Sequence, residues 1–150
     1  MQKNDIYEIE ITGMTDEGDG VGRINGFAVF VPYTIIGETV RIILIKVLKN
    51  YAVGKLIEVI IPSKSRTKSA CADFYKCGGC KLWHMSYEEE LLFKKKKVSD
   101  CLKRIGGFDN INIDDVVPSS KISRYRNKSQ FPVTLSLIHI SEPTRPISIS

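Results

Sequence analysis

The sequence predicts a mainly β fold, in which a small closed barrel at the N-terminal end is followed by a small α+β segment with a cysteine cluster. Hydrophobic and charged residues alternate over Ile6–Thr12, as they do in a half-buried strand. The dipeptide Asn25-Gly26 separates two further apolar runs and favours a two-residue hairpin. Three cysteines then lie within ten residues, between Cys71 and Cys80.

Five short runs rich in β-branched residues precede the cysteines. In the first run Tyr7, Ile9 and Ile11 share one face of the expected strand, and Glu8 and Glu10 share the other. We expect strands over residues 6–12, 21–24, 27–31, 39–47 and 53–60. Five short strands joined by tight turns indicate a barrel of the OB type, a fold that commonly binds oligonucleotides but does not dictate function.

The chain after the barrel is expected to form one helix and two strands. Residues 62–70 read as a polar, basic connector. Ser86 and Glu89 have the spacing of a capping box, and Gly106-Gly107 supplies a helix stop. The apolar side chains of this helix fall on one stripe, formed by Tyr87, Leu91, Val98, Cys101, Leu102 and Ile105. Residues 111–117 and 124–133 are expected to be strands.

Composition and charge limit the classes of function. The 150 residues are 43% hydrophobic and 26% charged, which fits one or two small globular domains. No apolar run reaches the ~18 residues of a membrane span, and the first residues lack a secretory signal pattern, so we expect a cytoplasmic protein without a membrane partner.

The net charge of +5 is unevenly distributed along the chain. Residues 1–60 carry six Lys and Arg against eight Asp and Glu, whereas residues 61–133 carry fifteen against eight. A basic surplus beside the cysteines predicts a polyanionic partner, and an ordinary basic surface is the alternative.

The motif Cys71-x5-Cys77-Gly-Gly-Cys80 predicts a metal centre. Clustered thiols in a reducing compartment are more often metal ligands than disulfides, and thiolates suit both zinc and iron–sulfur clusters. A zinc site requires a fourth ligand, for which His84 is the candidate. On the residues alone, zinc and an iron–sulfur cluster are equally favoured.

A basic strand near residue 130 is the main candidate for nucleic-acid contact. Basic and amide side chains alternate there beside Tyr125, whose ring can stack on an unpaired base. The candidate contacts are Arg124, Arg126, Asn127, Lys128, Gln130 and Phe131. An ordinary amphipathic strand is the alternative. The Lys94–Lys97 run is interpreted as a solvated helix face on which Glu90 pairs with Lys94, and contact with nucleic-acid phosphates is the alternative.

Four stretches of the chain together resemble a known family. They are GDGVGRINGFAVFVP at residues 18–32, CGGCKLWHMSY at residues 77–87, RIGG at residues 104–107 and YRNKSQFPV at residues 125–133. In content and order, over about residues 5–133, they resemble the N-terminal part of the TRAM-domain, iron–sulfur RNA uracil-C5-methyltransferases that modify 23S ribosomal RNA.

The resemblance implies a domain plan and a set of ligands. Residues 1–61 would be a TRAM barrel that binds RNA, residues 62–85 a linker with the cysteine cluster, and residues 86–133 the start of a central α+β domain. Cys71, Cys77 and Cys80 match three of the family's four ligands to a 4Fe–4S cluster, which favours the cluster over zinc.

The resemblance further implies S-adenosylmethionine as methyl donor, ribosomal RNA as partner, no DNA partner and a monomeric state. It also favours RNA contact by the basic strand. The alternative is a stand-alone RNA-binding module with a structural zinc site.

Residues 134–150 depart abruptly from the family pattern and resemble a translated sequencing-adapter read, so we leave them out of the fold prediction. In the family, the nucleophilic cysteine, the base and the methyl-donor site belong to a C-terminal Rossmann-like domain, which is expected to be absent from this chain. We therefore expect no methyl transfer by the chain itself. Cys101 is expected to be buried on the helix stripe rather than to act as nucleophile or fourth cluster ligand.

Overall fold

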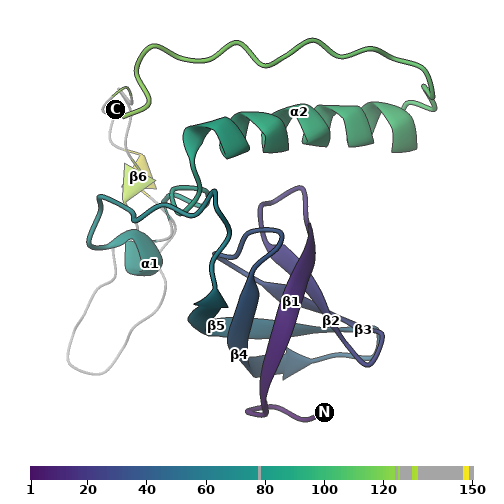
Figure 1. Cartoon of the computed structure of the whole chain (residues 1–150), viewed down its shortest axis with the longest axis vertical. Helices are drawn as coiled ribbons and strands as arrows, with labels where there is room; N and C mark the ends of the chain where they lie inside the picture. The colour runs from purple at the N-terminus through teal and green to yellow at the C-terminus, as the bar shows by residue number, and fades with distance from the viewer. Residues whose placement is uncertain (78, 124, 126–129, 132–146, 149–150) are drawn as a thin grey trace.

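The computed structural model describes residues 1–77, 79–123, 125, 130–131 and 147–148, and Figure 1 shows the arrangement of their helices and strands. The first five elements are β1 (Ile6–Met14), β2 (Gly20–Ile24), β3 (Phe27–Val31), β4 (Thr39–Val47) and β5 (Tyr51–Ile61). They are followed by α1 (Phe74–Cys77), α2 (Tyr87–Arg104), β6 (Gln130–Phe131) and β7 (Ile147–Ser148). The expected succession of five strands and a long helix is confirmed.

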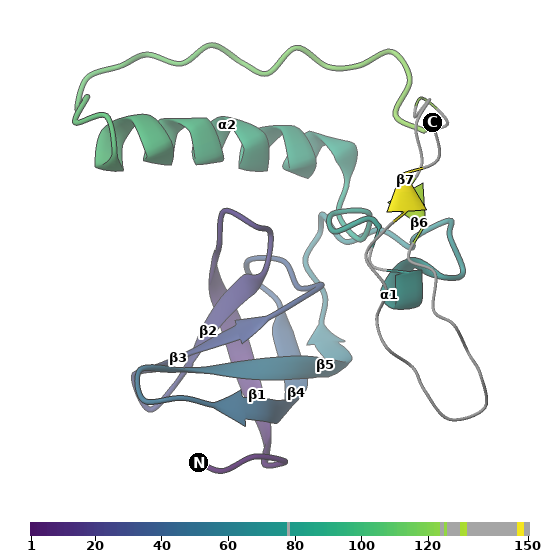
Figure 2. The ribbon, with the colours of Figure 1, turned by 180° about the vertical axis from the view of Figure 1, so that it is seen from behind.

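The first five strands form a closed barrel in the order β1-β2-β3-β5-β4, as seen from behind in Figure 2. β1 pairs with β4 from Ile6 opposite Ile43 to Glu10 opposite Thr39, which closes the barrel. β3 and β5 run parallel, whereas the other neighbouring strands are antiparallel. The prediction of a small closed barrel is therefore confirmed.

Alternation along the strands places the hydrophobic side chains inside the barrel. In β1, Ile9 and Ile11 are buried while Glu8 and Glu10 are exposed, as their spacing predicts. The buried core consists of Ile9, Ile11, Ile24, Val29, Val31, Val40, Ile42, Leu44 and Ala52. Burying one large aliphatic side chain contributes about 1.5–3 kcal/mol, so this cluster is the main source of the barrel's stability.

The hairpin between β2 and β3 has the predicted turn. Asn25 has a φ of 50° and Gly26 a φ of 83°, so both central residues are left-handed. This is the backbone of a type I′ turn, and Ile24 faces Phe27 directly across it. Asn and Gly tolerate this conformation better than other residues, which explains why the dipeptide marks the turn.

The ends of α2 follow the sequence signals with one difference. The Ser86 side chain accepts a hydrogen bond from the Glu89 amide at 3.3 Å, and Gly107 beyond the last turn has a φ of 69°. The Glu89 carboxylate does not complete the capping box. It accepts a hydrogen bond from the Ser65 hydroxyl at 3.0 Å, and the Ser86 amide donates to the Ser65 carbonyl at 2.7 Å.

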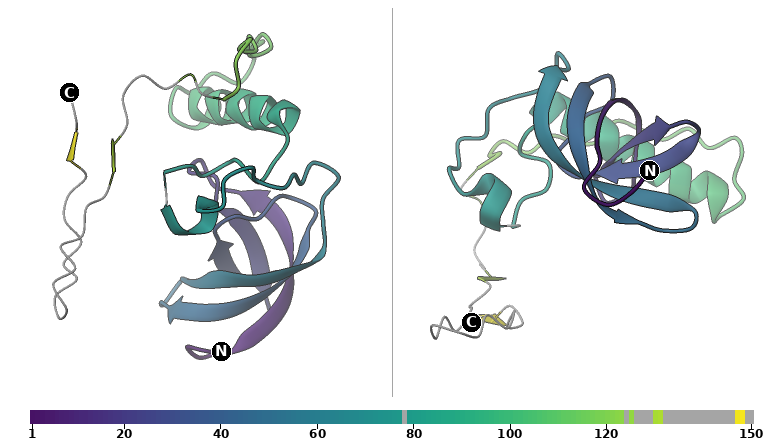
Figure 3. Two further views of the ribbon diagram at one scale, coloured as in Figure 1. Left: turned by 90° about the vertical axis from the view of Figure 1, so that its left-hand side faces the viewer. Right: turned by 90° about the horizontal axis from the view of Figure 1, so that it is seen from below.

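The apolar stripe of α2 is not buried, contrary to expectation. No residue of α2 is classed as buried, and Val98, Cys101 and Ile105 are exposed. Figure 3 shows α2 crossing the end of the barrel opposite the N-terminus. The prediction of a buried Cys101 is wrong, because spacing identifies an apolar face but not whether anything covers it. Within the described residues, no helix has the length and apolar composition needed to cross a bilayer.

The predicted strand over residues 111–117 is wrong. These residues have no regular secondary structure, and Val117 is exposed. Within the part of the chain that the structure describes, no strand pairs with them, and strand propensity depends on such neighbours. Of the predicted strand over 124–133, Gln130–Phe131 forms β6, which pairs antiparallel with Ile147–Ser148 of the tail. Residues 124, 126–129 and 132–133 lie outside the described residues.

Candidate nucleic-acid interface and cysteine segment

The cysteine segment, defined here as residues 62–86, docks on the loop between β3 and β4. From this loop the Tyr33 ring makes edge contacts with Phe74 and Tyr75, at centroid distances of 5.3 and 5.2 Å. The Phe74 ring is buried and lies 5.9 Å from the His84 ring. Tyr33, Phe74, Tyr75 and His84 form a cluster that we call the junction. Aromatic rings at these spacings add attraction to the area they bury.

A buried ion pair ties the connector to the barrel. Glu38 is fully buried and accepts hydrogen bonds from the Arg66 guanidinium, one of them at 2.8 Å, and from the Ile35 amide at 3.0 Å. Burial alone would raise the pKa of Glu38, but the hydrogen bonds from Arg66 and the two backbone amides outweigh it and hold the pKa below its usual value. Arg66 also donates to the Tyr33 carbonyl at 2.8 Å. The connector, residues 62–70, is thus fixed to the barrel at Arg66. The polar composition of the connector does not reveal this attachment.

His84 is a packing residue of the junction. Its side chain is fully buried, and Nε2 lies 3.4 Å from the Thr34 carbonyl oxygen. Nδ1 has no hydrogen-bond partner within the structure described. Burial lowers the pKa of His84, so the ring is neutral at physiological pH. This arrangement agrees with the packing role and gives no support to a zinc ligand at this position.

The cysteine thiols are free where the structure describes them. Cys71 is half-buried, Cys80 is exposed and neither forms a disulfide. Cys77 ends α1, and its side chain lies outside the described atoms. The described residues contain no group of three or more His, Cys, Asp or Glu side chains placed to hold a metal ion, and that search does not include the Cys77 thiol. The three-cysteine site therefore stays a prediction.

The predicted nucleic-acid contacts fall largely beyond the described structure. Arg124, Arg126, Asn127 and Lys128 lie outside it, and Gln130 and Phe131 are described only as the backbone of β6. Tyr125 is described and its side chain is exposed. These contacts also stay predictions.

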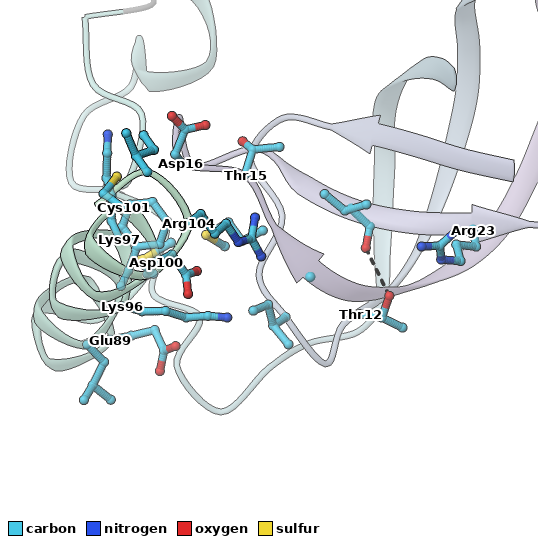
Figure 4. Close-up of a pocket in the computed structure, with 18 residues that line it drawn as sticks. Thr12, Thr15, Asp16, Arg23, Glu89, Lys96, Lys97, Asp100, Cys101 and Arg104 are labelled. Atoms are coloured by element: carbon cyan, nitrogen blue, oxygen red, sulfur yellow. Dashed lines mark hydrogen bonds between the residues drawn. The ribbon is translucent and has the colours of Figure 1, made fainter. Parts of the chain in front are cut away.

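A groove of about 810 Å³ separates α2 from the barrel. Figure 4 shows side chains of α2 facing the loop that joins β1 to β2. Four basic side chains line the groove, Arg23 from the barrel and Lys96, Lys97 and Arg104 from α2. Asp16, Glu89 and Asp100 also line it. We call this the helix–barrel groove.

The lysine run of α2 divides between paired and groove-lining residues. Lys94 pairs with Glu90 at 2.6 Å, as expected from their spacing, and Lys95 pairs with Asp115 at 2.7 Å. Lys96 and Lys97 line the helix–barrel groove and make no ion pair within the described residues. The interpretation of the whole run as a solvated face is therefore incomplete. Sequence reasoning missed this groove because nothing in the sequence places α2 across the end of the barrel.

Comparison with known proteins identifies the domain type of the barrel and finds relatives of the chain. The TRAM domain family model matches residues 2–57, which contain β1 to β4 and most of β5. A protein of Clostridium tetani named an uncharacterized RNA methyltransferase is 49% identical over 133 residues, which is 89% of this chain and 29% of that protein. A relative of similar name from Clostridium acetobutylicum is 46% identical with the same coverage. The chain thus spans about 29% of the length of these curated relatives.

A solved structure extends the similarity beyond the barrel. The Pyrococcus abyssi tRNA (uracil-54, C5)-methyltransferase, in complex with S-adenosyl-L-homocysteine, matches with a TM-score of 0.56 and 30% sequence identity. The match covers 85% of this chain and 27% of that chain, so it includes much of the cysteine segment and α2 as well as the barrel. The chain therefore carries a TRAM domain over residues 2–57 and, over the part that aligns, is similar to proteins named RNA methyltransferases.

Proposed function

We propose that this chain is the RNA-binding, cluster-bearing part of an S-adenosylmethionine-dependent RNA uracil-C5-methyltransferase, with 23S ribosomal RNA as substrate. The observation that carries the proposal is the match to the Pyrococcus abyssi enzyme over barrel, cysteine segment and helix together, because a barrel alone serves many functions. The relatives named RNA methyltransferases support the same reaction class. The choice of ribosomal RNA rests on the sequence resemblance.

The helix–barrel groove supports RNA as the partner. Four basic side chains line it, against three carboxylates, and Lys96 and Lys97 are free of ion pairs within the described residues. Lys and Arg that face phosphates supply affinity and orientation without reading sequence. The RNA backbone would therefore lie between α2 and the barrel, and Gln130 with the basic residues around it would extend the contact.

Cys71, Cys77 and Cys80 would hold a 4Fe–4S cluster. The donor set fits chemically, since the two thiols that are described are free and lie in the segment that the junction anchors to the barrel. A cluster bound through thiolates would cross-link this segment and fix its shape. By the resemblance, the family's fourth ligand is a further cysteine that lies downstream of the aligned part, so these three residues would supply three of the four protein ligands.

The methyl transfer itself belongs to the longer protein. In the proposed reaction a cysteine thiolate adds to C6 of the uracil. C5 then attacks the methyl group of S-adenosylmethionine, and S-adenosylhomocysteine is the leaving group. A base removes the C5 proton and the thiolate is expelled, which restores the ring double bond. The target uridine must first leave its stack. The resemblance assigns all of these groups to the downstream domain, so this chain alone should transfer no methyl group.

Two measurements on the purified chain test the proposal. The first combines binding to unmodified ribosomal RNA with an assay for 5-methyluridine using labelled S-adenosylmethionine. We expect binding without methylation. Failure to bind RNA would overturn the RNA-binding role, and 5-methyluridine in the product would overturn the assignment of catalysis to the downstream domain.

The second measurement is metal analysis after anaerobic purification. Iron with acid-labile sulfide and visible absorbance supports the cluster. Colourless protein with one equivalent of zinc would overturn it and favour the alternative, an RNA-binding module with structural zinc.

A further inference from the structure

A second groove, of about 740 Å³, is formed by the cysteine segment, α2 and residues that follow α2. Three parts of the chain form its walls, namely residues 79–83, the first turns of α2, and the described residues Ser119, Lys121, Ile122, Ser123 and Tyr125. Three aromatic side chains line it, from Trp83, Tyr87 and Tyr125. We call it the aromatic groove.

Hydrogen bonds hold the walls of the aromatic groove in place. The Ser119 amide donates to the Tyr87 hydroxyl at 2.7 Å, which ties the distal wall to α2. The Ser119 hydroxyl donates to the Lys121 carbonyl at 2.9 Å and fixes a local turn. On the opposite wall, the Met85 amide donates to the Leu82 carbonyl at 3.1 Å and curls the chain around Trp83. The groove is therefore a formed feature rather than a gap between independent segments.

The rings remain accessible although the walls are fixed. Trp83 is 39% exposed and Tyr125 is 70% exposed. Both rings therefore keep solvent-exposed surface within the groove lining. A nucleic-acid base is a planar ligand that stacks well on exposed aromatic rings.

The charges of the aromatic groove favour an anion. Lys81, Lys94 and Lys121 line it, and Glu90 is the only carboxylate among its lining residues. Glu90 is paired with Lys94 at 2.6 Å, and Lys81 pairs with Glu17 at 3.0 Å outside the groove. Lys121 makes no ion pair within the described residues. A net positive groove with exposed rings combines the two features that bind unpaired nucleic acid, a cationic track and stacking platforms.

We propose that the aromatic groove binds unpaired nucleotides of the RNA, with one base stacked on Trp83 and the next on Tyr125, and with Lys121 contacting the intervening phosphate. This inference rests on the proposed function for the identity of the nucleic acid. It adds a site for single-stranded RNA that is separate from the helix–barrel groove, whose only aromatic lining residue is Phe93. The two grooves would then divide the substrate, with the backbone of the folded part in one and splayed bases in the other.

The experiment uses Trp83 as its own reporter, because it is the only tryptophan of the chain. Trp83 emission is titrated with a 12-nucleotide oligouridylate and with a fully paired RNA duplex of the same length. Total binding of each RNA is measured in parallel by fluorescence anisotropy of end-labelled copies. We expect quenching of Trp83 by the single strand only, since paired bases cannot reach the ring.

Three variants sharpen the test. Tyr125→Ala should weaken binding of the oligouridylate at least about fivefold, the lower limit for removing one stacking side chain. Lys121→Ala should reduce the slope of log binding constant against log salt concentration by about 1, the value expected for the loss of one phosphate contact. Tyr51→Ala is the control, because this ring is 40% exposed on β5, outside the lining of either groove, and its loss should leave Trp83 quenching unchanged. Circular dichroism verifies that each variant is folded.

The outcomes separate this inference from the proposed function. Binding by anisotropy with unchanged Trp83 emission would overturn the aromatic groove as a site while RNA binding stands. Equal quenching by duplex and single strand, or wild-type affinity in Tyr125→Ala, would overturn it as well. If neither RNA changes the anisotropy, RNA binding itself fails and the groove proposal fails with it.

Discussion

The barrel and the chain that follows it are stabilised in different ways. The barrel, residues 6–61, encloses nine buried hydrophobic residues and closes on itself through β1 and β4. Among the described residues that follow the barrel, Phe74, His84 and Met85 are buried, and α2 has no buried residue. The barrel is therefore stabilised by its own core, whereas the cysteine segment is held by the junction and the Glu38–Arg66 pair. Stability resides in one region and most of the candidate binding surface in the other.

Truncating a core side chain should have the largest effect and should distinguish the two regions directly. Leu44 is fully buried in the barrel and Leu92 is 60% exposed on α2. Leu44→Ala should lower the free energy of unfolding by about 3 kcal/mol, because it removes buried methyl groups and leaves a cavity. Leu92→Ala should change it by less than about 0.5 kcal/mol. Chemical denaturation measures both, and equal losses would contradict the division between the regions.

Removing the charge of Glu38 tests how the cysteine segment is held. Glu38→Gln weakens the hydrogen bonds between this fully buried position and the half-buried Arg66, and should lower the free energy of unfolding by about 2 kcal/mol. It should also speed tryptic cleavage at Lys64 and Lys68, which flank Arg66 in the connector. Glu58→Gln is the matched control, since the pair of Glu58 with Arg41 is solvent-exposed and should contribute much less to stability. Unchanged proteolysis in Glu38→Gln would mean that the pair does not anchor the segment.

A glycine pair isolates one contact between the regions. A Cβ on Gly18 would lie 2.6 Å from the Leu82 side chain, whereas a Cβ on Gly37 would meet nothing within 4 Å. Both glycines have a positive φ, so each alanine substitution carries a backbone cost of about 1–2 kcal/mol. Gly18→Ala should therefore lose more stability than Gly37→Ala in thermal unfolding, and the difference measures the cost of displacing Leu82. No difference would indicate that Leu82 moves away without cost.

The pH dependence of stability should reveal the burial of His84. Its folded pKa is lowered by burial, so below the unfolded value of about 6.5 the unfolded chain takes up the proton first. The contribution of neutral His84 to stability is fully present above about pH 6.5, and it is lost as the pH falls through the folded pKa. Glu38, whose pKa is also lowered, adds a second loss below its unfolded value of about 4.3.

Unfolding curves between pH 7.5 and 5 measure the histidine contribution. His139, the other histidine of the chain, lies outside the described residues, and His139→Gln provides the control. That variant should keep the loss of stability on acidification, whereas His84→Gln should remove it. A flat profile for the unmodified chain would exclude a buried neutral histidine at this position.

The barrel could be predicted because its signals are local. Alternation in Ile6–Thr12 and the Asn25-Gly26 turn specify strands and a hairpin without reference to the rest of the chain. The caps of α2 were likewise predicted from Ser86 and Gly106-Gly107. The exposure of Cys101 could not be predicted, because periodicity indicates which side of a helix is apolar and not whether another element covers that side.

The junction could not be predicted for a related reason. Glu38 and Arg66 are 28 residues apart, and each reads as an ordinary surface charge in its own neighbourhood. Only the closed barrel brings them together beside Tyr33. The aromatic groove depends in the same way on the turn at Ser119 meeting Tyr87, a contact across 32 residues. The cysteine motif, by contrast, was visible at once, because metal ligands are recognised by residue type and spacing.

The pairing of β1 with β4 also constrains how the protein can be made. β1 pairs first with β2, which follows it directly, but its second partner is distant, since Ile6 faces Ile43 of β4. The parallel seam of β3 with β5 begins only with Tyr51. Contacts this distant in sequence make folding slow relative to local helix formation. Because the cysteines follow β5 in the sequence, their thiols emerge from the ribosome after the whole barrel, which would give assembly of the proposed cluster a preformed platform.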